Sequence, residues 1–411
     1  MDHPLIDCHA HIIPPHVDLT VLCDQLVQCS QRNVYVVGVS ESSMDASLML
    51  SLWQLGQSVK ESATHSDVSH SLQTPLPTWF VERLPLDLHN GAQADPSTWW
   101  QLGRLYYERV LLCTGVHPMQ ANALYSPVSA TATLSATNSD SNATVAVQNS
   151  VVSTPEVPKY RSAQLDDLSQ LTNILHTHCT HSANNSTLTP PPQMSLYKFI
   201  VGVGEIGLDF SPHVLRGDYY LATHQPPGSP NTSLTKKECD ERAKLNQQTV
   251  FRRQVEWAAQ YGLTLNIHSR QAGKYAIQLL KELAPQLETG GLSLPPVLLH
   301  AFDGKLGFVQ QALDLGCYFS VAPYVLYASK PQGIVQLVPL DRLVLESDTP
   351  SLGPDPQHTD QNQPSNIHKV AEYIARVKQV TVEQVAYQTT RNAACLFPKL
   401  IQHWTWLKDY Q

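Results

Sequence analysis

Residues 5–11 read LIDCHAH, a short apolar run that ends in two histidines one residue apart. Because alternate side chains of a strand point to opposite faces, His9 and His11 would point the same way while Cys8 and Ala10 turn away. Apolar runs without polar alternation are typical of parallel strands that are buried on both faces. This stretch therefore predicts a buried strand that carries a pair of imidazoles at its carboxyl end.

Seven further apolar runs of the same kind follow along the chain, each bounded by turn residues. Together with the first, they are Leu5–Ile6, Val34–Val39, Val110–Cys113, Phe199–Val203, Leu263–Ile267, Val297–Leu299, Cys317–Val321 and Leu343–Leu345. Helical patterns lie between or after several of them, notably over Cys239–Tyr261 and Ile367–Val377. A capping-box sequence at Thr381 predicts the start of another helix. Eight strands that alternate with helices predict an α/β fold, a (β/α)8 TIM barrel.

Long polar stretches interrupt this pattern, and we interpret them as loop insertions. We expect one barrel domain over residues 1–411, with low-complexity insertions at approximately 61–104, 126–164, 180–195 and 211–237. The Ser/Thr-rich tract 126–154 contains no Lys, Arg or aromatic residue and is expected to be a disordered spacer, with a lid or partner-binding arm as the alternative. The segment Trp99–Arg109 could stack bases, but packing against the barrel wall is the favoured interpretation.

Composition excludes several classes of protein. With 27 Lys+Arg against 35 Asp+Glu, the net charge is −8, which excludes a protein that grips nucleic acid by bulk positive charge. No apolar stretch is long enough to span a membrane, and the start of the chain lacks the pattern of a signal peptide. Eight scattered cysteines without a CxxC pair indicate free thiols in a reducing compartment. We therefore expect an intracellular protein, cytoplasmic or nuclear, without membrane contact.

Polar residues stand at the ends of most of the predicted strands, where the active sites of such barrels lie. A single histidine after an apolar run is more often a hydrogen-bonded core residue than a ligand. Taken together, however, the strand ends place four histidines and two carboxylates on one rim. Buried charge at that density is costly unless it binds metal or forms paired networks. These six residues are His9, His11, Glu205, His268, His300 and Asp348.

Six such ligands exceed the needs of one tetrahedral catalytic site, but two ions that share a bridging carboxylate use them well. Under this hypothesis one divalent ion is held by His9, His11 and Asp348, the second by His268 and His300, and Glu205 bridges the two. Four imidazoles favour Zn²⁺, Mn²⁺, Co²⁺ or Ni²⁺ over an ion that prefers oxygen ligands alone. We expect two divalent ions per subunit, Zn²⁺ or Mn²⁺, with Mg²⁺ as the alternative.

Six short motifs carry a family resemblance. In chain order they read DCHAH, TGVHP, VGEIGLDF, NIHSR, LLHAFDG and LESDTPSLGP, and a Gln247-x-x-Val250-Phe251-x-x-Gln254 pattern precedes the fifth strand. This ordered set resembles the TatD family of metal-dependent deoxyribonucleases, within the amidohydrolase-like barrels. GLDFSP, HAFDGK, SLGP and LFPKL are most similar to its TatD DNase domain-containing protein 3 branch. The family's metal residues map onto the same six positions of this sequence.

The resemblance implies hydrolysis of phosphodiester bonds, with single-stranded DNA or DNA ends as the substrate and shortening from the 3′ end. Two bound ions would lower the pKa of a shared water, and Asp348 would orient that water or accept its proton. His117 and Arg270 are predicted to hold phosphate oxygens. The alternatives are that His117 only fixes a turn before proline and that Arg270 pairs with a rim carboxylate. Lys305 is interpreted as solvated, and Asp209 and Asp303 as residues that orient ligands or backbone.

Two other functions stay open at this point. One is a hydrolase of small esters, amides or phosphates on the same barrel, although relatives of that kind often bridge their metals with a carboxylated lysine where this chain has Glu205. The other is a metal-binding interaction protein that has lost catalysis, whose signature would be a missing ligand. The sequence makes no prediction of oligomeric state.

Overall fold

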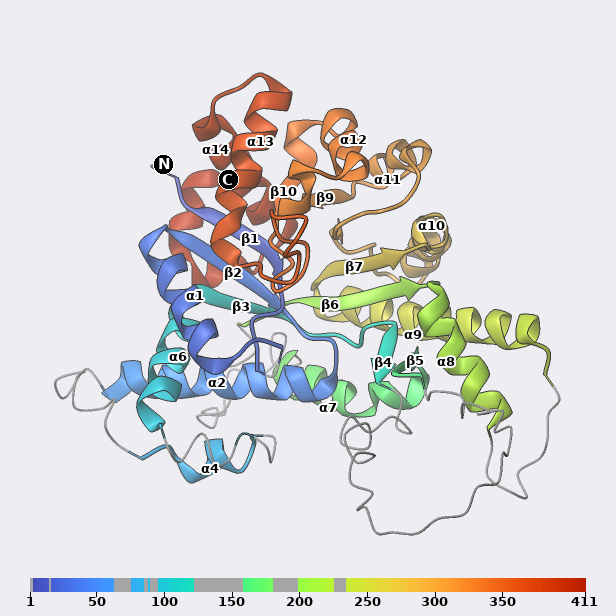
Figure 1. The fold of residues 1–411 in the computed structure, drawn as a ribbon, viewed down its shortest axis with the longest axis horizontal. Helices are drawn as coiled ribbons and strands as arrows, with labels where there is room; N and C mark the ends of the chain where they lie inside the picture. The colour runs from blue at the N-terminus through green and yellow to red at the C-terminus, as the bar shows by residue number, and fades with distance from the viewer. Residues whose placement is uncertain are drawn as a thin grey trace, which may run out of the picture.

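Eight parallel strands close into a barrel in the order β1-β10-β9-β8-β7-β6-β3-β2 (Figure 1). A computed structural model describes residues 3–14, 16–62, 75–84, 88, 95–121, 158–179, 199–224 and 234–411. The barrel strands are β1 Leu5–Ala10, β2 Val34–Val39, β3 Val110–Cys113, β6 Ile200–Asp209, β7 Thr264–Arg270, β8 Val297–Leu299, β9 Tyr318–Val321 and β10 Leu343–Leu345. Each of the eight runs expected from the sequence is a strand, which confirms the predicted TIM barrel.

Helices surround the barrel and cover its outer face (Figure 1). They are α1 Leu19–Gln31, α2 Ser43–Ser62, α4 Thr78–Val81, α6 Pro96–Arg109, α7 Ser169–Cys179, α8 Pro212–Thr223, α9 Lys236–Tyr261, α10 Gly273–Thr289, α11 Val309–Asp314, α12 Ser329–Leu337, α13 Ile367–Lys378, α14 Val382–Leu396 and α15 Leu400–His403. Because helices cover the sheet outside and side chains fill it inside, the strands are buried on both faces.

Local capping signals set the starts of two of these helices. The Thr235 hydroxyl accepts from the backbone N–H of Glu238, whose carboxylate accepts from the backbone N–H of Thr235, so α9 begins three residues before the predicted start. The same reciprocal pair between Thr381 and Gln384 starts α14, as the sequence predicts. The helix expected over Ile367–Val377 is α13, one residue longer.

Helix α6 begins inside the expected insertion 61–104. Trp99 and Trp100 of α6 are buried, so this segment packs against the wall formed with α1 and α2 and does not offer its indoles to bases. A Cβ at Gly56 of α2 would overlap the carbonyl of Gly103 of α6, so the two helices approach this closely only because both positions are glycine.

Two other expected insertions also contain regular structure. Residues Pro212–Thr223 of the expected insertion 211–237 form α8, which buries Val214 and Leu215. At the end of 126–164, β5 (Tyr160–Ser162) pairs antiparallel with β4 (Met119–Ala121) beside the barrel (Figure 1). Residues 126–154 and 180–195 lie outside the described part of the chain.

Two features of the sequence that bear on compartment can be compared with the structure. All eight cysteines are free, and seven of them are buried. Among the described residues, no helix combines the length and the apolar character that crossing a membrane requires.

Candidate metal centre

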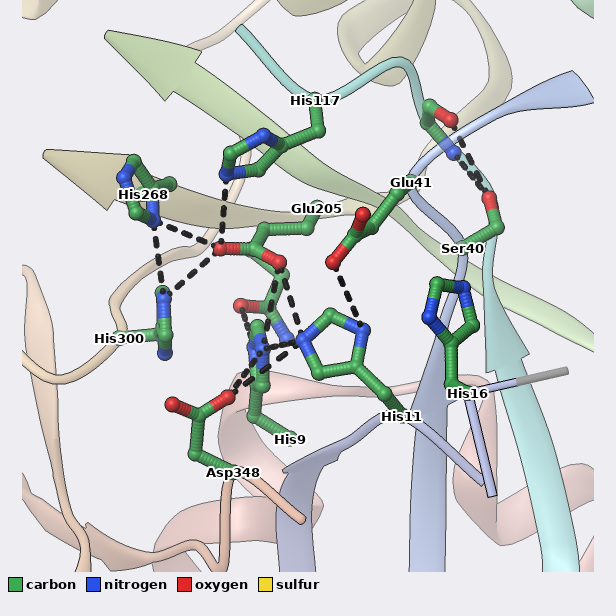
Figure 2. A network of polar contacts seen from close by, with 12 residues as sticks. His9, His11, His16, Ser40, Glu41, His117, Glu205, His268, His300 and Asp348 are labelled. Atoms are coloured by element: carbon green, nitrogen blue, oxygen red, sulfur yellow. Dashed lines mark hydrogen bonds and ion pairs between the residues drawn. The ribbon is translucent and has the colours of Figure 1, made fainter. Parts of the chain in front are cut away.

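The carboxyl ends of the barrel strands surround a cleft of about 400 Å³. Five of the six predicted ligands line its floor, and the sixth, His9, is fully buried beside them. Each of the six is at most 8% exposed, and they lie together in one cluster (Figure 2). His9 belongs to β1, Glu205 to β6 and His268 to β7. His11 and His300 directly follow β1 and β8, and Asp348 stands three residues after the end of β10. The parallel barrel brings these distant positions together because all its strands end at the same rim.

Glu205 is at the centre of the cluster, and its two carboxylate oxygens face different histidines (Figure 2). Oε2 lies 3.5 Å from His9 Nε2 and 3.3 Å from His11 Nε2. Oε1 lies 2.8 Å from His268 Nδ1 and 2.9 Å from His300 Nε2. One carboxylate therefore joins two separate pairs of imidazoles.

Asp348 closes the side of the cluster that contains the first histidine pair. Its Oδ1 atom lies 3.5 Å from His9 Nε2 and 3.4 Å from His11 Nε2. Two backbone hydrogen bonds fix this geometry, since Asp348 N–H donates to the His9 carbonyl and His11 N–H donates to the Thr349 carbonyl. Asp348 has a φ of 56°, a left-handed conformation that aspartate tolerates better than most residues.

Each of the four imidazoles turns one nitrogen to the centre and the other to an acceptor further out. His9 Nδ1 lies 2.9 Å from Asn266 Oδ1, and His11 Nδ1 lies 3.6 Å from Glu41 Oε1. His268 Nε2 lies 3.4 Å from Asp209 Oδ2, and His300 Nδ1 lies 3.4 Å from Glu346 Oε2. Outer acceptors of this kind fix the tautomer and orientation of metal-binding histidines.

The donor set fits divalent metal ions. Three groups of side chains each place three possible ligand atoms within 4.8 Å of one another: His9 with His11 and Glu205, His117 with Glu205 and His268, and His9 with His300 and Glu346. Buried nitrogens of His11 and His268 have no hydrogen-bond partner among the described residues, although each faces a carboxylate at a longer distance. Imidazole and carboxylate ligands in this number suit Zn²⁺, Mn²⁺ and related ions.

The electrostatics of the cluster favour cations. Burial alone would raise the pKa of the Glu205 carboxyl, but His117, His300 and His9 hold that pKa well below its usual range. Burial also opposes ionisation of Asp348, yet the contact with His11 and the nearby His300 lower its pKa. Both carboxylates are therefore anionic at neutral pH.

His117 and Arg270, the predicted substrate-binding residues, both line the cleft. His117 is buried, and its Nε2 lies 3.4 Å from Glu205 Oε1, so it belongs to the floor of the cleft. Arg270 at the end of β7 is exposed, and its guanidinium has no carboxylate partner within salt-bridge distance in the described part of the chain. Lys305 is exposed and does not line the cleft.

Two glutamines of α9 hold the backbone at the ends of the adjacent strands β3 and β6. The Gln254 side chain accepts from Val116 N–H at 2.8 Å and donates to the Val116 carbonyl at 3.0 Å, next to His117. Seven residues earlier, Gln247 makes the same pair of bonds with the backbone of Asp209, both at 2.8 Å. Both glutamines are fully buried, so the sequence pattern Gln247-x-x-Val250-Phe251-x-x-Gln254 has a structural role in positioning the rim.

Glu41 and Tyr324 are among the cleft residues that the sequence did not predict. Glu41 stands two residues after β2, and Tyr324 follows β9, so all eight strands contribute to the rim. The only sequence signal for Glu41 and Tyr324 is that each stands shortly after a predicted strand, because neither belongs to a recognisable motif. Asn266 could have been found from β7, since it shares a face with His268 two residues later.

Comparison with known proteins agrees with this geometry. A family model described as TatD related DNase matches residues 6–398. The chain is 37% identical over 201 residues to a Homo sapiens protein named deoxyribonuclease TATDN3, a match that covers 49% of this chain and 61% of that protein. It is 30% identical over 207 residues to a Bacillus subtilis protein named uncharacterized metal-dependent hydrolase YabD, covering 50% of this chain and 68% of the relative. The chain thus spans less than two thirds of its human relative.

Two solved structures share the fold. One is YJJV, a TATD homolog from Escherichia coli, with a TM-score of 0.51 and 17% identity over 96% of this chain and 98% of that one. The other is an uncharacterized amidohydrolase from Saccharomyces cerevisiae, with a TM-score of 0.54 and 16% identity over 96% of this chain and all (100%) of the other. At these identities the likeness concerns the fold alone.

Proposed function

Because the chain belongs to the TatD related DNase family, we propose that it is a metal-dependent hydrolase that cleaves phosphodiester bonds at DNA ends. The observation that carries the proposal is that the two carboxylate oxygens of Glu205 face two different histidine pairs at the floor of an open cleft. This arrangement supports two divalent ions, one near His9, His11 and Asp348 and one near His268 and His300. The substrate we propose is single-stranded DNA, shortened from its 3′ end.

The ions, when bound, supply Lewis acidity that acidifies water and stabilises charge on the phosphate oxygens. The protein's own contribution begins with Asp348, which is anionic and therefore able to take the proton of the attacking water at its carboxylate. The backbone bonds to β1 keep that carboxylate beside His9 and His11 throughout the reaction. The geometry of proton transfer is in this way fixed before substrate binds.

Arg270 is proposed to hold the scissile phosphate from the rim. Its guanidinium is free of carboxylate partners among the described residues, and planar N–H donors match phosphate oxygens bidentately. His117 lines the same cleft, and although burial opposes it, Glu205 raises the pKa of this histidine, so a cationic imidazole there would attract the phosphate. Both residues would then act on substrate orientation more than on proton transfer.

The size and charge of the cleft favour a strand end over a long duplex. A cleft of about 400 Å³ is in the range of small-molecule pockets and holds little more than one nucleotide. The same observation favours a second candidate, a hydrolase of small phosphate esters, because such a substrate also fits this space. A chain with a net charge of −8 is expected to bind long nucleic acid poorly, which agrees with either a strand end or a small phosphate ester as the substrate.

Degradation of a 5′-labelled single-stranded oligonucleotide with Mg²⁺, Mn²⁺ or Zn²⁺ tests the proposal. We expect a ladder that shortens from the 3′ end, and Asp348→Asn should slow it by about 10²- to 10⁴-fold. Asp341→Asn is the matched control, since Asp341 is an exposed carboxylate before β10 and away from the cleft. Absence of DNA cleavage with every ion, in protein that binds metal and hydrolyses a small phosphodiester, would replace the first candidate with the second.

A further inference from the structure

Glu41 is the only one of the four outer acceptors in the described structure that reaches solvent. Asn266, Asp209 and Glu346, which face His9, His268 and His300, are all fully buried. The Glu41 side chain is 32% exposed and lines the cleft beside His11. The His11 imidazole is therefore supported differently from the other three.

The other nitrogen of His11 is committed to the centre of the cluster. His11 Nε2 lies 3.3 Å from Glu205 and 3.4 Å from Asp348, so Nε2 is the atom available to a metal ion. His11 Nδ1 is buried and has no hydrogen-bond partner in the part of the chain that the structure describes, although Glu41 Oε1 lies only 3.6 Å away (Figure 2). A histidine that binds metal through Nε2 carries its proton on Nδ1, and that proton needs an acceptor.

The backbone of Glu41 is held in place, which keeps its side chain near His11. Glu41 N–H donates to the Asp45 carboxylate at 3.2 Å, and the Glu41 carbonyl accepts from His117 N–H at 2.9 Å. The carboxylate itself has no other partner within hydrogen-bond or ion-pair distance in the described part of the chain. A small rotation of the Glu41 side chain is enough to turn the 3.6 Å contact into a hydrogen bond.

We propose that Glu41 is a positioning residue that accepts the Nδ1 proton of His11 and so sets how tightly the ion near His9 and His11 is held. The inference rests on the proposed metal centre and goes beyond it, because it assigns the control of one ion to a carboxylate on the cleft wall. Since this carboxylate reaches the cleft, a substrate that covers it also strengthens the contact by removing water. The ion near His11 is on this basis the more readily exchanged of the two.

Metal titration of the metal-free protein tests the inference without DNA. Calorimetry with Mn²⁺ should show that Glu41→Ala weakens one of two binding events about 10-fold and leaves the other unchanged. Glu41→Gln keeps a carbonyl oxygen that can accept the Nδ1 proton, so its affinity should stay within about threefold of the wild type. Asp303→Asn is the charge-matched control, because Asp303 lines the same cleft and contacts no histidine of the cluster.

Histidine-selective ¹⁵N spectra of the metal-loaded protein give a second readout. Wild type and Glu41→Gln should retain one slowly exchanging imidazole N–H that Glu41→Ala lacks. Equal weakening by Glu41→Ala, Glu41→Gln and Asp303→Asn would overturn the inference, because Glu41 would then act only through its charge. Unchanged Mn²⁺ affinity in Glu41→Ala would overturn it as well. Because no DNA is used, absence of nuclease activity would contradict the proposed function and leave this inference standing.

Discussion

Replacement of Gln254 by leucine should destabilise the protein, because the backbone of the loop after β3 would lose two buried hydrogen bonds. Gln254 is fully buried, and its amide makes two hydrogen bonds of 2.8 and 3.0 Å with the N–H and carbonyl of Val116. Leucine fills a similar volume but leaves both backbone groups without a partner. Each buried unsatisfied group costs about 1–3 kcal/mol, and burial of the leucine side chain offsets part of this, so the expected loss is about 2–4 kcal/mol.

Urea unfolding followed by circular dichroism measures this loss, and a matched control is available on the same helix. Gln260 of α9 is exposed, so Gln260→Leu changes the same side chain without removing a buried bond. We expect the control to stay within about 0.5 kcal/mol of the wild type. If Gln254→Leu also stays within that range, the two bonds contribute no net stability and the reasoning is refuted.

Three further perturbations have expected outcomes. Removal of metal with a chelator should lower the Tm, and Mn²⁺ or Zn²⁺ at about 100 times its Kd should restore about 2.7 kcal/mol of the free energy of unfolding. An identical Tm with and without metal would contradict a metal site in the folded protein. Asp45→Asn should lower the Tm more at about pH 6 than at about pH 9, because the Asp45 contact, opposed by burial, raises the pKa of His16. The stability that comes from a raised histidine pKa is present at low pH and is lost as the pH rises through that pKa. A difference in Tm that does not depend on pH would exclude this pair as the cause. Gly56→Ala should loosen the packing of α2 on α6 and destabilise the protein by about 1–3 kcal/mol in urea unfolding, whereas the exposed Gly307, which has open space around its Cα, should accept alanine with little effect.

The barrel could be predicted because its strands are buried on both faces. Runs such as Val110–Cys113 and Leu343–Leu345 contain no polar residue to confuse the pattern, and their observed bounds match the expected ones. The clustering of histidines and carboxylates follows from the same topology, since parallel strands deliver the residues at their ends to one rim. Strand identity and cluster membership were for this reason predictable together.

The parts that could not be predicted depend on contacts between distant residues. Glu41 stands between two serines, and nothing in its neighbourhood separates it from a solvated carboxylate. The helix α8 buries only a short apolar face with Val214 and Leu215, too little to show a period of 3.6 residues beside a proline-rich stretch. The outer acceptor Glu346 precedes Asp348 by two residues, and only the fold shows that it faces His300.

Gln247 and Gln254 connect α9 to the rim of the barrel, and we call each pair of hydrogen bonds a glutamine clamp. Gln247 and Gln254 are separated by seven residues, which is roughly 10 Å along the helix axis. Each clamp holds both polar groups of one backbone residue, so neither the Val116 loop nor the Asp209 turn can slide along the helix independently. A shift of α9 therefore moves the backbone after both of these adjacent strands together. A helix on the outer wall of the barrel is in this way tied to the part of the rim that carries His117.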